Sequence, residues 1–220
     1  MIIAIDGPAA SGKSTTAKLV AEKLNLTYID TGAMYRAAAL FALNNKIKIS
    51  DNPKLKGLIE KIHIEFKQNG REIFLNRVNV SKNIRTENIS KLSSAIGTIG
   101  FVRRKLVQLQ REMGRSCSVV LEGRDIGSVV FPKADFKFFI VADVVQRAKR
   151  RFVELKKKGL EVDIKEIKKK LVLRDKQDST RDVSPLVKIE DAIEIDTTYL
   201  NIAQQVGKIV RIVASSQKNT

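Results

Sequence analysis

The sequence predicts an α/β protein whose parallel sheet is covered by helices on both faces. Two observations predict this fold class: short apolar segments alternate with amphipathic segments along most of the 220 residues, and a glycine-rich loop joins the first such pair. Each helical crossover returns the chain in the same direction, so the strands of such repeats pair in parallel. One inserted segment breaks the alternation and predicts a small antiparallel sheet beside the main one.

The glycine-rich loop is the most specific signal in the chain. Residues 7–14 read G-P-A-A-S-G-K-S, directly after the apolar residues 1–5 and before a helical pattern. The order strand, loop, helix is the context that a phosphate-binding loop (P-loop) requires, so we expect a three-layer P-loop NTPase core. The alternative is a strand-to-helix turn that binds nothing, and the flanking pattern disfavours it.

We expect this loop to hold the phosphates of a nucleotide. The backbone N–H groups of such a loop point at an anion, and the positive end of the following helix dipole adds to the attraction. Lys13 would reach the β- and γ-phosphates, and Ser14 would ligate Mg²⁺. The expected nucleotide-binding residues of the loop are Gly7, Pro8, Ala9, Ala10, Ser11, Gly12, Lys13, Ser14 and Thr15.

The remaining core elements follow in order from the apolar periodicity. We expect a strand at 2–6, a helix at 13–24 with Ala17, Val20, Ala21 and Leu24 at helical spacing, a strand at 27–29 and a helix to about residue 43. The later segments repeat the scheme, with strands at 118–121, 136–141 and 192–195, helices at 144–158 and 164–173, and a final helix, capped by Thr197 or Thr198, that runs to about residue 214.

The inserted segment spans residues 45–87, so the core comprises residues 1–44 and 88–220. Within it, 62–66 and 72–75 alternate with period two around a turn at Asn69 and Gly70, which is typical of a hairpin. Because two strands alone are marginally stable, we expect a third strand at 77–80 and packing on a helix. We interpret the insert as a mobile subdomain on the substrate side, with an inert decoration of the core as the alternative.

Composition narrows the class of protein. The chain has no apolar stretch near the ~20 residues that span a bilayer and no signal-peptide pattern, so we expect a cytoplasmic protein without a membrane partner. The single cysteine, Cys117, lies in an apolar run, and we expect a small core residue rather than a nucleophile. The single histidine, His63, alternates with apolar residues and is expected to face the surface. A zinc site or a Ser-His-Asp triad is therefore disfavoured.

The formal net charge of +17 raises the question of a nucleic-acid partner. Much of the excess lies between Arg147 and Lys176, on segments with helical periodicity. These segments are rich in lysine and lack interleaved aromatic residues, so platforms for base stacking are missing. We favour a solvated basic face that steers small anionic substrates over specific nucleic-acid binding.

Polar residues follow several predicted strands, at the sheet edge where doubly wound proteins bind ligands. Arg36 lies about one turn into the helix after residues 30–32, and Glu122 and Arg124 follow the strand at 118–121. An acidic group at such a strand end can order a Mg²⁺-bound water, and an arginine can pair with phosphate. A polar run at 174–181 adds further arginines. Together these segments predict a second anion site that faces the loop.

The sequence resembles the bacterial cytidylate kinases of the nucleoside monophosphate kinase group. The resemblance rests on runs that cover the chain in the family's order: 5–8 through 12–14, 30–36, 84–86, 93–94 with 102–103, 122–127 with 130–132, 174–175 with 178–179 and 181, and 184–186. The insert lies where this family carries its CMP-side subdomain. Departures are conservative, such as Glu122 where many members have Asp and Thr31 where some have Ser.

The resemblance implies Mg²⁺-dependent transfer of the γ-phosphoryl group from ATP to CMP or dCMP, without an essential histidine. It implies a lid at about 147–176 whose Arg147, Arg150 and Arg151 close over the ATP phosphates. The implied catalytic residues are Lys13, Arg124, Asp125, Arg174 and Arg181. The implied CMP-binding residues are Thr31, Arg36, Ser94, Arg103, Arg124, Asp125, Arg174, Asp178 and Arg181.

Each implied CMP contact has a chemical role. Arg36 and Arg124 suit the phosphate, because a guanidinium fork matches phosphate oxygens. Ser94, Arg103 and Asp125 suit the cytosine edge, where an acceptor can take the exocyclic amine. Arg174 and Asp178 suit the ribose, and Arg181 suits either the base or the phosphate.

Two other classes of function stay open at this point. One is a related kinase that acts on UMP, AMP or shikimate, although those relatives lack the combination of Ser94, Arg103, Asp125 and Asp178 with the insert. The other is a nucleic-acid-binding or GTPase-like regulatory module, although the Asn-Lys-x-Asp motif of GTPases is missing from the sequence. We expect a monomer that uses nucleotides as its partners.

Overall fold

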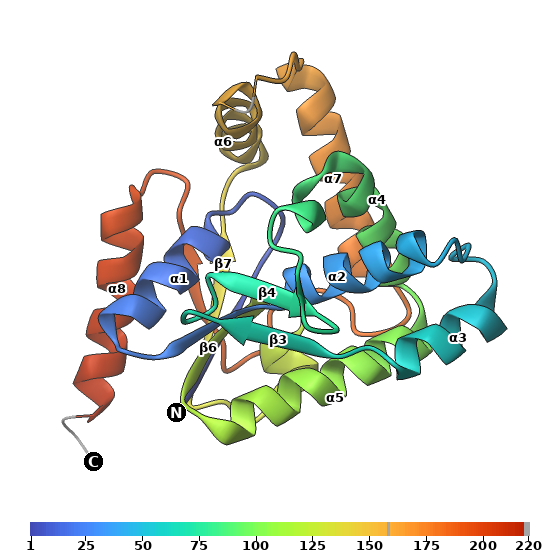
Figure 1. Ribbon diagram of the computed structural model, residues 1–220. Coiled ribbons are helices and arrows are strands. Elements are labelled where there is room, and N and C mark those ends of the chain that lie inside the picture. The colour runs from blue at the N-terminus through green and yellow to red at the C-terminus, as the bar shows by residue number, and fades with distance from the viewer. Residues whose placement is uncertain (158, 218–220) are drawn as a thin grey trace.

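The computed structural model describes residues 1–157 and 159–217 (Figure 1). The strands are β1 (Ile2–Asp6), β2 (Thr27–Asp30), β3 (Ile64–Lys67), β4 (Glu72–Leu75), β5 (Val78–Asn79), β6 (Val119–Gly123), β7 (Phe136–Val141) and β8 (Ile193–Asp196). The helices are α1 (Lys13–Lys23), α2 (Thr31–Asn44), α3 (Asn52–Glu60), α4 (Glu87–Ile96), α5 (Gly100–Ser116), α6 (Val144–Lys157), α7 (Ile164–Thr180) and α8 (Ile202–Gln217), with short turns η1 (Asn83–Arg85) and η2 (Ile126–Val130).

The main sheet confirms the predicted parallel α/β fold. Its five strands lie in the order β2-β6-β1-β7-β8, and every neighbouring pair is parallel. In the centre, Ile3 of β1 lies opposite Val120 of β6 and Phe136 of β7. The carboxyl ends of β1, β6 and β2 therefore reach the same edge of the sheet, and the polar segments that follow them are brought together there.

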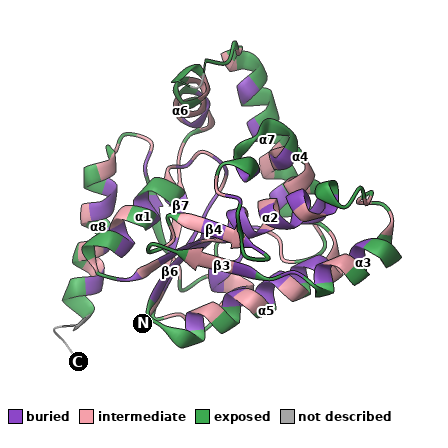
Figure 2. Cartoon of the chain, viewed as in Figure 1, coloured by how far each residue is buried: buried purple, intermediate pink, exposed green. Residues whose placement is uncertain are grey.

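Helices cover both faces of this sheet, as Figure 1 shows. Ile3 and Ile5 face one apolar cluster with α1 and α8, whereas Ala4 between them faces a second cluster with α2, α5 and the insert. The alternation follows from the period of a strand, in which successive side chains point to opposite faces. Because both faces are covered, the central strands β1 and β6 are buried almost throughout (Figure 2), whereas the edge strand β8 is exposed at three of its four positions.

The insert forms the expected three-stranded antiparallel sheet, in the order β3-β4-β5. Its apolar side chains, including Leu55, Ile59 and Ile73, belong to the same cluster as Met34 of α2, so the insert shares the core of the protein. The hairpin turn also approaches β2: a Cβ atom on Gly70, whose φ is +79°, would lie 2.0 Å from the carbonyl oxygen of Tyr28. The mobility that we expect of the insert stays a prediction.

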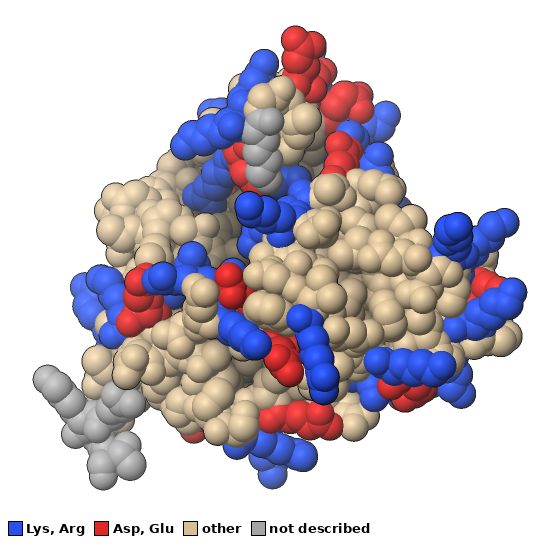
Figure 3. Space-filling model, in the orientation of Figure 1, with Lys and Arg blue, Asp and Glu red and all other residues tan. Residues whose placement is uncertain are grey.

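Helices α6 and α7 pack on each other above the loop that follows β1 (Figure 1). Ala148 of α6 and Ile167 and Leu171 of α7 form a small cluster with Ala9 of that loop. Lys and Arg side chains gather over these two helices in the upper part of Figure 3. The predicted basic lid, without residue 158, therefore corresponds to a helix pair that contacts the glycine-rich loop.

Two predicted helix boundaries were wrong. Helix α7 does not end at residue 173 but continues to Thr180, so Arg174 lies on a helix and not in a loop, and Arg181 is the C-cap of that helix. Helix α8 does not begin at Thr197 or Thr198 but at Ile202. There Asn201 Oδ1 accepts the Gln204 N–H at 2.9 Å, and Gln204 Oε1 accepts the Asn201 N–H at 2.9 Å, a reciprocal capping arrangement.

The single histidine and the single cysteine of the sequence both lie on the surface. His63 is exposed, as expected, and its Nε2 lies 2.7 Å from Glu65 Oε1. Cys117 is exposed as well, which corrects the prediction that it packs in the core. It is the residue just after α5 and precedes the first buried position of β6, so the apolar run begins two residues later than the cysteine. Across residues 1–157 and 159–217, no helix combines the length and apolar character needed to cross a membrane.

The close approach of Gly70 to β2 leads to a stability prediction. We expect Gly70→Ala to lower the free energy of unfolding by more than about 2 kcal/mol, because the residue has a left-handed conformation and the added methyl group meets Tyr28. Gly57→Ala is the matched control within the insert: no described atom lies within 4 Å of its Cβ position in α3, and the change is expected to stabilise by about 0.5 to 1 kcal/mol. Urea denaturation measures both values. Equal stability of the two variants would contradict the docked hairpin.

Candidate nucleotide site

The glycine-rich loop leaves β1 in a conformation that only glycine allows at its first position. Gly7 has φ +149°, and a Cβ atom there would lie 2.1 Å from the carbonyl oxygen of Ile140 in β7. The loop ends at Gly12, which has φ +93° and offers no side chain to cap α1. The first N–H groups of α1 have no partner within the helix, so they are available to an anion at the loop.

Lys13 is the first residue of α1, and its side chain turns back into the site. It is buried, donates to the carbonyl oxygen of Pro8 at 3.2 Å and lies 3.8 Å from Glu122 Oε2. Burial, and then the positive charge of Arg124, lower the pKa of Lys13 well below its ordinary value, although Glu122 opposes the shift. An anion that entered this site would stabilise the charged form of the lysine.

Glu122 is fixed at the end of β6 by the neighbouring strand β2. The hydroxyl of Tyr28 donates to Glu122 Oε1 at 3.0 Å, and the hydroxyl of Thr31 donates to the Glu122 carbonyl oxygen at 2.7 Å. The carboxylate is buried and faces Lys13. Thr31 therefore lies beside Glu122 with its hydroxyl on the backbone of β6, and its contact with CMP stays a prediction.

The residues around the loop fit a magnesium ion that is held mainly by nucleotide phosphates. Ser14 and Thr15 are exposed at the start of α1, so the Ser14 hydroxyl is free to serve as a ligand. Within residues 1–157 and 159–217, no three His, Cys, Asp or Glu side chains gather into a metal-binding group. Mg²⁺ commonly keeps several waters and takes few protein ligands in nucleotide sites, so a lone hydroxyl suits it.

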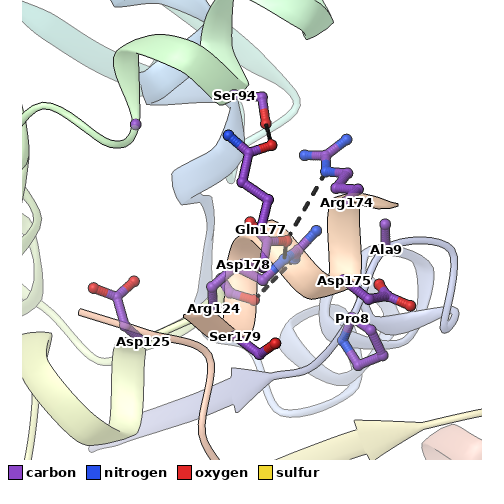
Figure 4. A network of polar contacts seen from close by, with 12 residues as sticks. Pro8, Ala9, Ser94, Arg124, Asp125, Arg174, Asp175, Gln177, Asp178 and Ser179 are labelled. Carbon is purple, nitrogen blue, oxygen red and sulfur yellow. Dashed lines mark hydrogen bonds and ion pairs between the residues drawn. The ribbon is translucent and has the colours of Figure 1, made fainter. Parts of the chain in front are cut away.

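Opposite the loop, Arg124 and Asp178 form the central ion pair of a second polar cluster (Figure 4). Arg124 Nε donates to Asp178 Oδ2 at 2.8 Å, and both side chains are at most 16% exposed. Burial alone would raise the pKa of Asp178, but the charge and hydrogen bond of Arg124, followed by the charges of Arg174 and Arg181, hold it below its ordinary value. The ion pair joins the segment after β6 to the end of α7.

Arg174 and Arg181 add positive charge that the protein does not fully pair. Arg174 Nε and Arg181 Nη2 are shielded from solvent and have no hydrogen-bond acceptor among the described residues. The nearest carboxylate oxygens lie 4.0 Å from Arg174 Nε, on Asp178, and 3.9 Å from Arg181 Nη2, on Asp125. Burial, and then the charge of Arg103, lower the pKa of Arg181. Such unpaired N–H groups favour an anion between the two arginines.

Asp125 lies at the other side of this cluster, between two arginines. Its Oδ2 accepts a hydrogen bond from Arg103, and its Oδ1 lies near Arg181. Arg103 also donates to the Gly97 carbonyl oxygen at 2.9 Å and lies over the Tyr35 ring, 5.4 Å from its centroid. Asp125 is thus a buried acceptor whose position is fixed by arginines from α5 and from the C-cap of α7.

The last two residues predicted to bind CMP, Arg36 and Ser94, lie at the rim of the cluster. Arg36 donates to Asp30 Oδ2 at 2.8 Å, while Asp30 Oδ1 accepts the Ala33 N–H and caps α2. Ser94 of α4 donates to Gln177 Oε1 at 3.3 Å and so meets α7 (Figure 4). The structure therefore brings all nine predicted CMP-binding residues to the edge of the sheet, on α2, α4, α5, α7 with its C-cap, and the segment after β6.

The three predicted lid arginines contact protein groups. Arg147 is buried, donates to the carbonyl oxygen of Ala9 at 3.2 Å and pairs with Asp175 at 2.7 Å. Arg150 donates to the Ser11 carbonyl oxygen at 3.1 Å, and Arg151 pairs with Glu154 on α6. Arg147 and Arg150 therefore hold the backbone of the loop, so the closure of these arginines over ATP stays a prediction.

Several residues of the site were missed in the sequence. Asp6, Tyr28, Asp175 and Gln177 touch predicted site residues or the segments that carry them. The position of Asp6, directly before the loop, was a usable signal. The partners of the others depend on tertiary contacts, such as the packing of α7 against α4 and α6, that no local pattern shows.

The glycine-rich loop with Lys13, and the arginine–aspartate cluster that faces it, define a P-loop phosphotransferase with separate donor and acceptor sites. A family model described as cytidylate kinase matches residues 3–215. The chain belongs to the cytidylate kinase family, and it is therefore an enzyme of the kinase class.

Individual relatives agree with the family. A cytidylate kinase from Lactobacillus johnsonii is 46% identical over 221 residues, with 100% of this chain and 96% of the relative covered. A cytidylate kinase from Bacillus subtilis is 45% identical over 218 residues, with 98% and 97% covered. A solved structure of an uncharacterized protein from Eubacterium ventriosum has a TM-score of 0.54 at 17% identity, covering 98% of this chain and 99% of that chain, and supports the fold alone.

The buried ion pair of Asp178 with Arg124 leads to a second prediction. Asp178→Asn should lower the free energy of unfolding by about 3 kcal/mol at pH 7, because Arg124 then keeps a buried charge without its partner. Glu194→Ala is the control: it breaks an ion pair with Lys188 whose side chains are 44% and 45% exposed, and it should cost less than about 1 kcal/mol. Urea denaturation measures both, and similar values for the two variants would contradict the assignment.

The same pair predicts a pH dependence. The pKa of Asp178 is lower in the folded protein than in the unfolded chain, so its stabilising contribution is present at neutral pH and is lost as the pH falls through the folded pKa. The stability difference between the unmodified protein and Asp178→Asn should therefore shrink below about pH 4. Repeating the urea titrations between pH 7 and pH 3 tests this, and a difference that stayed constant would count against it.

Proposed function

We propose that this enzyme transfers the γ-phosphoryl group of ATP to CMP and dCMP, forming CDP and dCDP. The observation that carries the proposal is the set of buried guanidinium N–H groups on Arg174 and Arg181 that lack acceptors beside the phosphate-binding loop. These N–H groups could bind a second phosphate next to the phosphates of the donor. Membership of the cytidylate kinase family supports cytidine as the base.

The donor ATP is proposed to lie on the loop of residues 7–15. Backbone N–H groups and the α1 dipole hold its phosphates, and the Lys13 ammonium turns from Glu122 toward the β- and γ-phosphates. Ser14 would hold Mg²⁺, which neutralises phosphate charge when it is bound. Arg147 and Arg150 hold the loop carbonyls, so they position the loop while α6 and α7 exclude water.

The cytosine is proposed to pair with Asp125, Arg103 and Ser94. Asp125 is a buried carboxylate, and it can accept a hydrogen bond from the exocyclic amine of cytosine. Uracil presents a carbonyl oxygen at the same position, which leaves the carboxylate unpaired and repelled. Arg103 and Arg181 hold Asp125 in place, so its carboxylate cannot turn away when uracil is bound instead of cytosine.

The CMP phosphate and ribose are proposed to lie on the arginine side of the cluster. Arg36 and Arg124 face the phosphate, and Arg174 with Asp178 faces the ribose. Arg181 lies between Asp125 and Asp178 and reaches either the base or the phosphate. Catalysis then requires alignment of the two phosphates and neutralisation of their charge by Lys13, Arg124, Arg174 and Arg181.

The proposal includes the setting of the enzyme. We propose a cytoplasmic monomer whose partners are small nucleotides. The lysine-rich surface of α6 and α7 would steer anionic substrates toward the site, and we propose no specific nucleic-acid partner. A kinase for UMP, AMP or shikimate is the alternative that the same fold would permit.

A substrate panel tests the proposal directly. With ATP and Mg²⁺, ADP formation is measured against CMP, dCMP, UMP, AMP and shikimate, and separately with RNA or DNA as the only addition. CMP and dCMP should give the largest kcat/KM, and nucleic acid should give no stimulation. Turnover of UMP equal to that of CMP would overturn the assignment of Asp125 to the base.

The position of Lys13 predicts a large kinetic effect. Lys13→Ala should lower kcat with CMP by about 100- to 1,000-fold, because a preorganised charge at the transferred group is removed. Lys18→Ala is the matched control, since Lys18 is exposed on the same helix, and it should keep kcat within about twofold. Coupled ADP assays at saturating ATP and CMP measure both. A Lys13→Ala enzyme with near-normal kcat would show that the loop lysine does not act on the donor.

A further inference from the structure

Asp6 is a buried carboxylate that none of the roles above uses. It is the last residue of β1, and only 6% of its surface is exposed. Its Oδ1 accepts the N–H of Ile126 at 2.9 Å, and its Oδ2 accepts the N–H of Gly127 at 2.8 Å. These are the first two N–H groups of the short turn η2, and such groups have no acceptor within the turn itself.

We propose that Asp6 is a positioning residue for the acceptor nucleotide, because it fixes the backbone that carries Arg124 and Asp125. The inference rests on the proposed function, in which these two side chains contact the CMP phosphate and the cytosine. It deepens that function by naming the group that sets their position.

The segment of Arg124 and Asp125 is held at both ends by this one residue. On one side, the backbone of Asp6 lies opposite Gly123, the last residue of β6. On the other side, its carboxylate holds the N–H groups of Ile126 and Gly127. A two-residue bridge anchored at each end has little freedom, so the side chains of Arg124 and Asp125 leave the backbone in fixed directions.

The charge of Asp6 favours a functional role over a purely stabilising one. Burial raises the pKa of Asp6 to about 6, against the effect of the two N–H bonds, with Asp125 raising it further and Arg124 lowering it. A buried charged carboxylate at neutral pH therefore opposes folding, and a neutral side chain would avoid this cost. Only a carboxylate, however, offers two acceptor oxygens to two successive N–H groups.

The donor loop is anchored independently of the Asp6 side chain. The following residue, Gly7, is pressed against the Ile140 carbonyl oxygen through its backbone. Loss of the Asp6 carboxylate should therefore displace the acceptor segment far more than the ATP loop. This difference separates positioning of the acceptor from a general structural role.

The test is Asp6→Asn in the full-length enzyme, with steady-state kinetics for both substrates. The asparagine keeps one acceptor oxygen and places an NH₂ group against the other N–H. We expect KM for CMP to rise about 10-fold or more and the ratio of kcat/KM for CMP over UMP to fall about fivefold or more, with KM for ATP changed by less than about threefold.

Asp135→Asn, just before β7, is the matched control. Asp135 Oδ2 accepts the Ile2 N–H at 2.6 Å at the opposite end of β1, so this variant also removes a carboxylate that holds backbone, but far from the site. It should keep both KM values and the base preference of the unmodified enzyme. Equal rises of both KM values in Asp6→Asn with an unchanged CMP:UMP ratio, or kinetics like those of the unmodified enzyme, would overturn the proposal.

A measurement on the unmodified protein covers the case in which Asp6→Asn does not fold. Amide hydrogen exchange at Ile126 and Gly127 should slow when CMP is added, and it should slow less with a non-hydrolysable ATP analogue. Equal protection by the two ligands, or none by CMP, would overturn the role of Asp6. If the unmodified enzyme failed to phosphorylate CMP at all, the proposed function itself would fail, so the two failures are distinguishable.

Discussion

The close contact between the backbone of Gly7 and the carbonyl oxygen of Ile140 is the constraint on which the site depends. It leaves no room for a side chain, and it turns the chain out of β1 at the edge where β6 and β2 also end. Lys13 consequently begins its helix beside Glu122 and not on the far side of the sheet. A parallel sheet brings the carboxyl ends of its strands to one edge because each strand returns through a helix. The fold class therefore determines where the site lies.

Charge balance is the second theme of the molecule. Four arginines, Arg103, Arg124, Arg174 and Arg181, surround two carboxylates, Asp125 and Asp178, on the proposed acceptor side. Burial, and then the charge of Arg103, lower the pKa of Arg181, and N–H groups of Arg174 and Arg181 have no acceptor among the described residues. In the proposed complex, a phosphate dianion would supply acceptors for these N–H groups and compensate the arginine charge.

Much of the fold and of the site was predictable because its signals are local. The loop motif, the apolar strands and the Asn69–Gly70 hairpin each occupy a few adjacent residues. The length of α7 was not predictable, because its last turns carry polar side chains whose partners, such as Arg124, come from elsewhere in the chain. Thr197 was misjudged for a similar reason: its hydroxyl lies 2.9 Å from the Ser11 carbonyl oxygen and holds the loop, and it does not cap a helix. The end of α7 and the role of Thr197 depend on tertiary contacts, which the periodicity of the sequence does not reveal.

Helix α7 carries two attachments less than one turn apart. Asp175 is tied to Arg147 and thereby to the loop, and Asp178 is tied to Arg124 beside the acceptor. A helix is stiff over so short a span, so Asp175 and Asp178 move together when α7 moves. Any tilt that loosened the grip on the donor would also pull a carboxylate away from the acceptor. The loop of the proposed donor site and the proposed acceptor cluster are therefore joined through the same short stretch of α7.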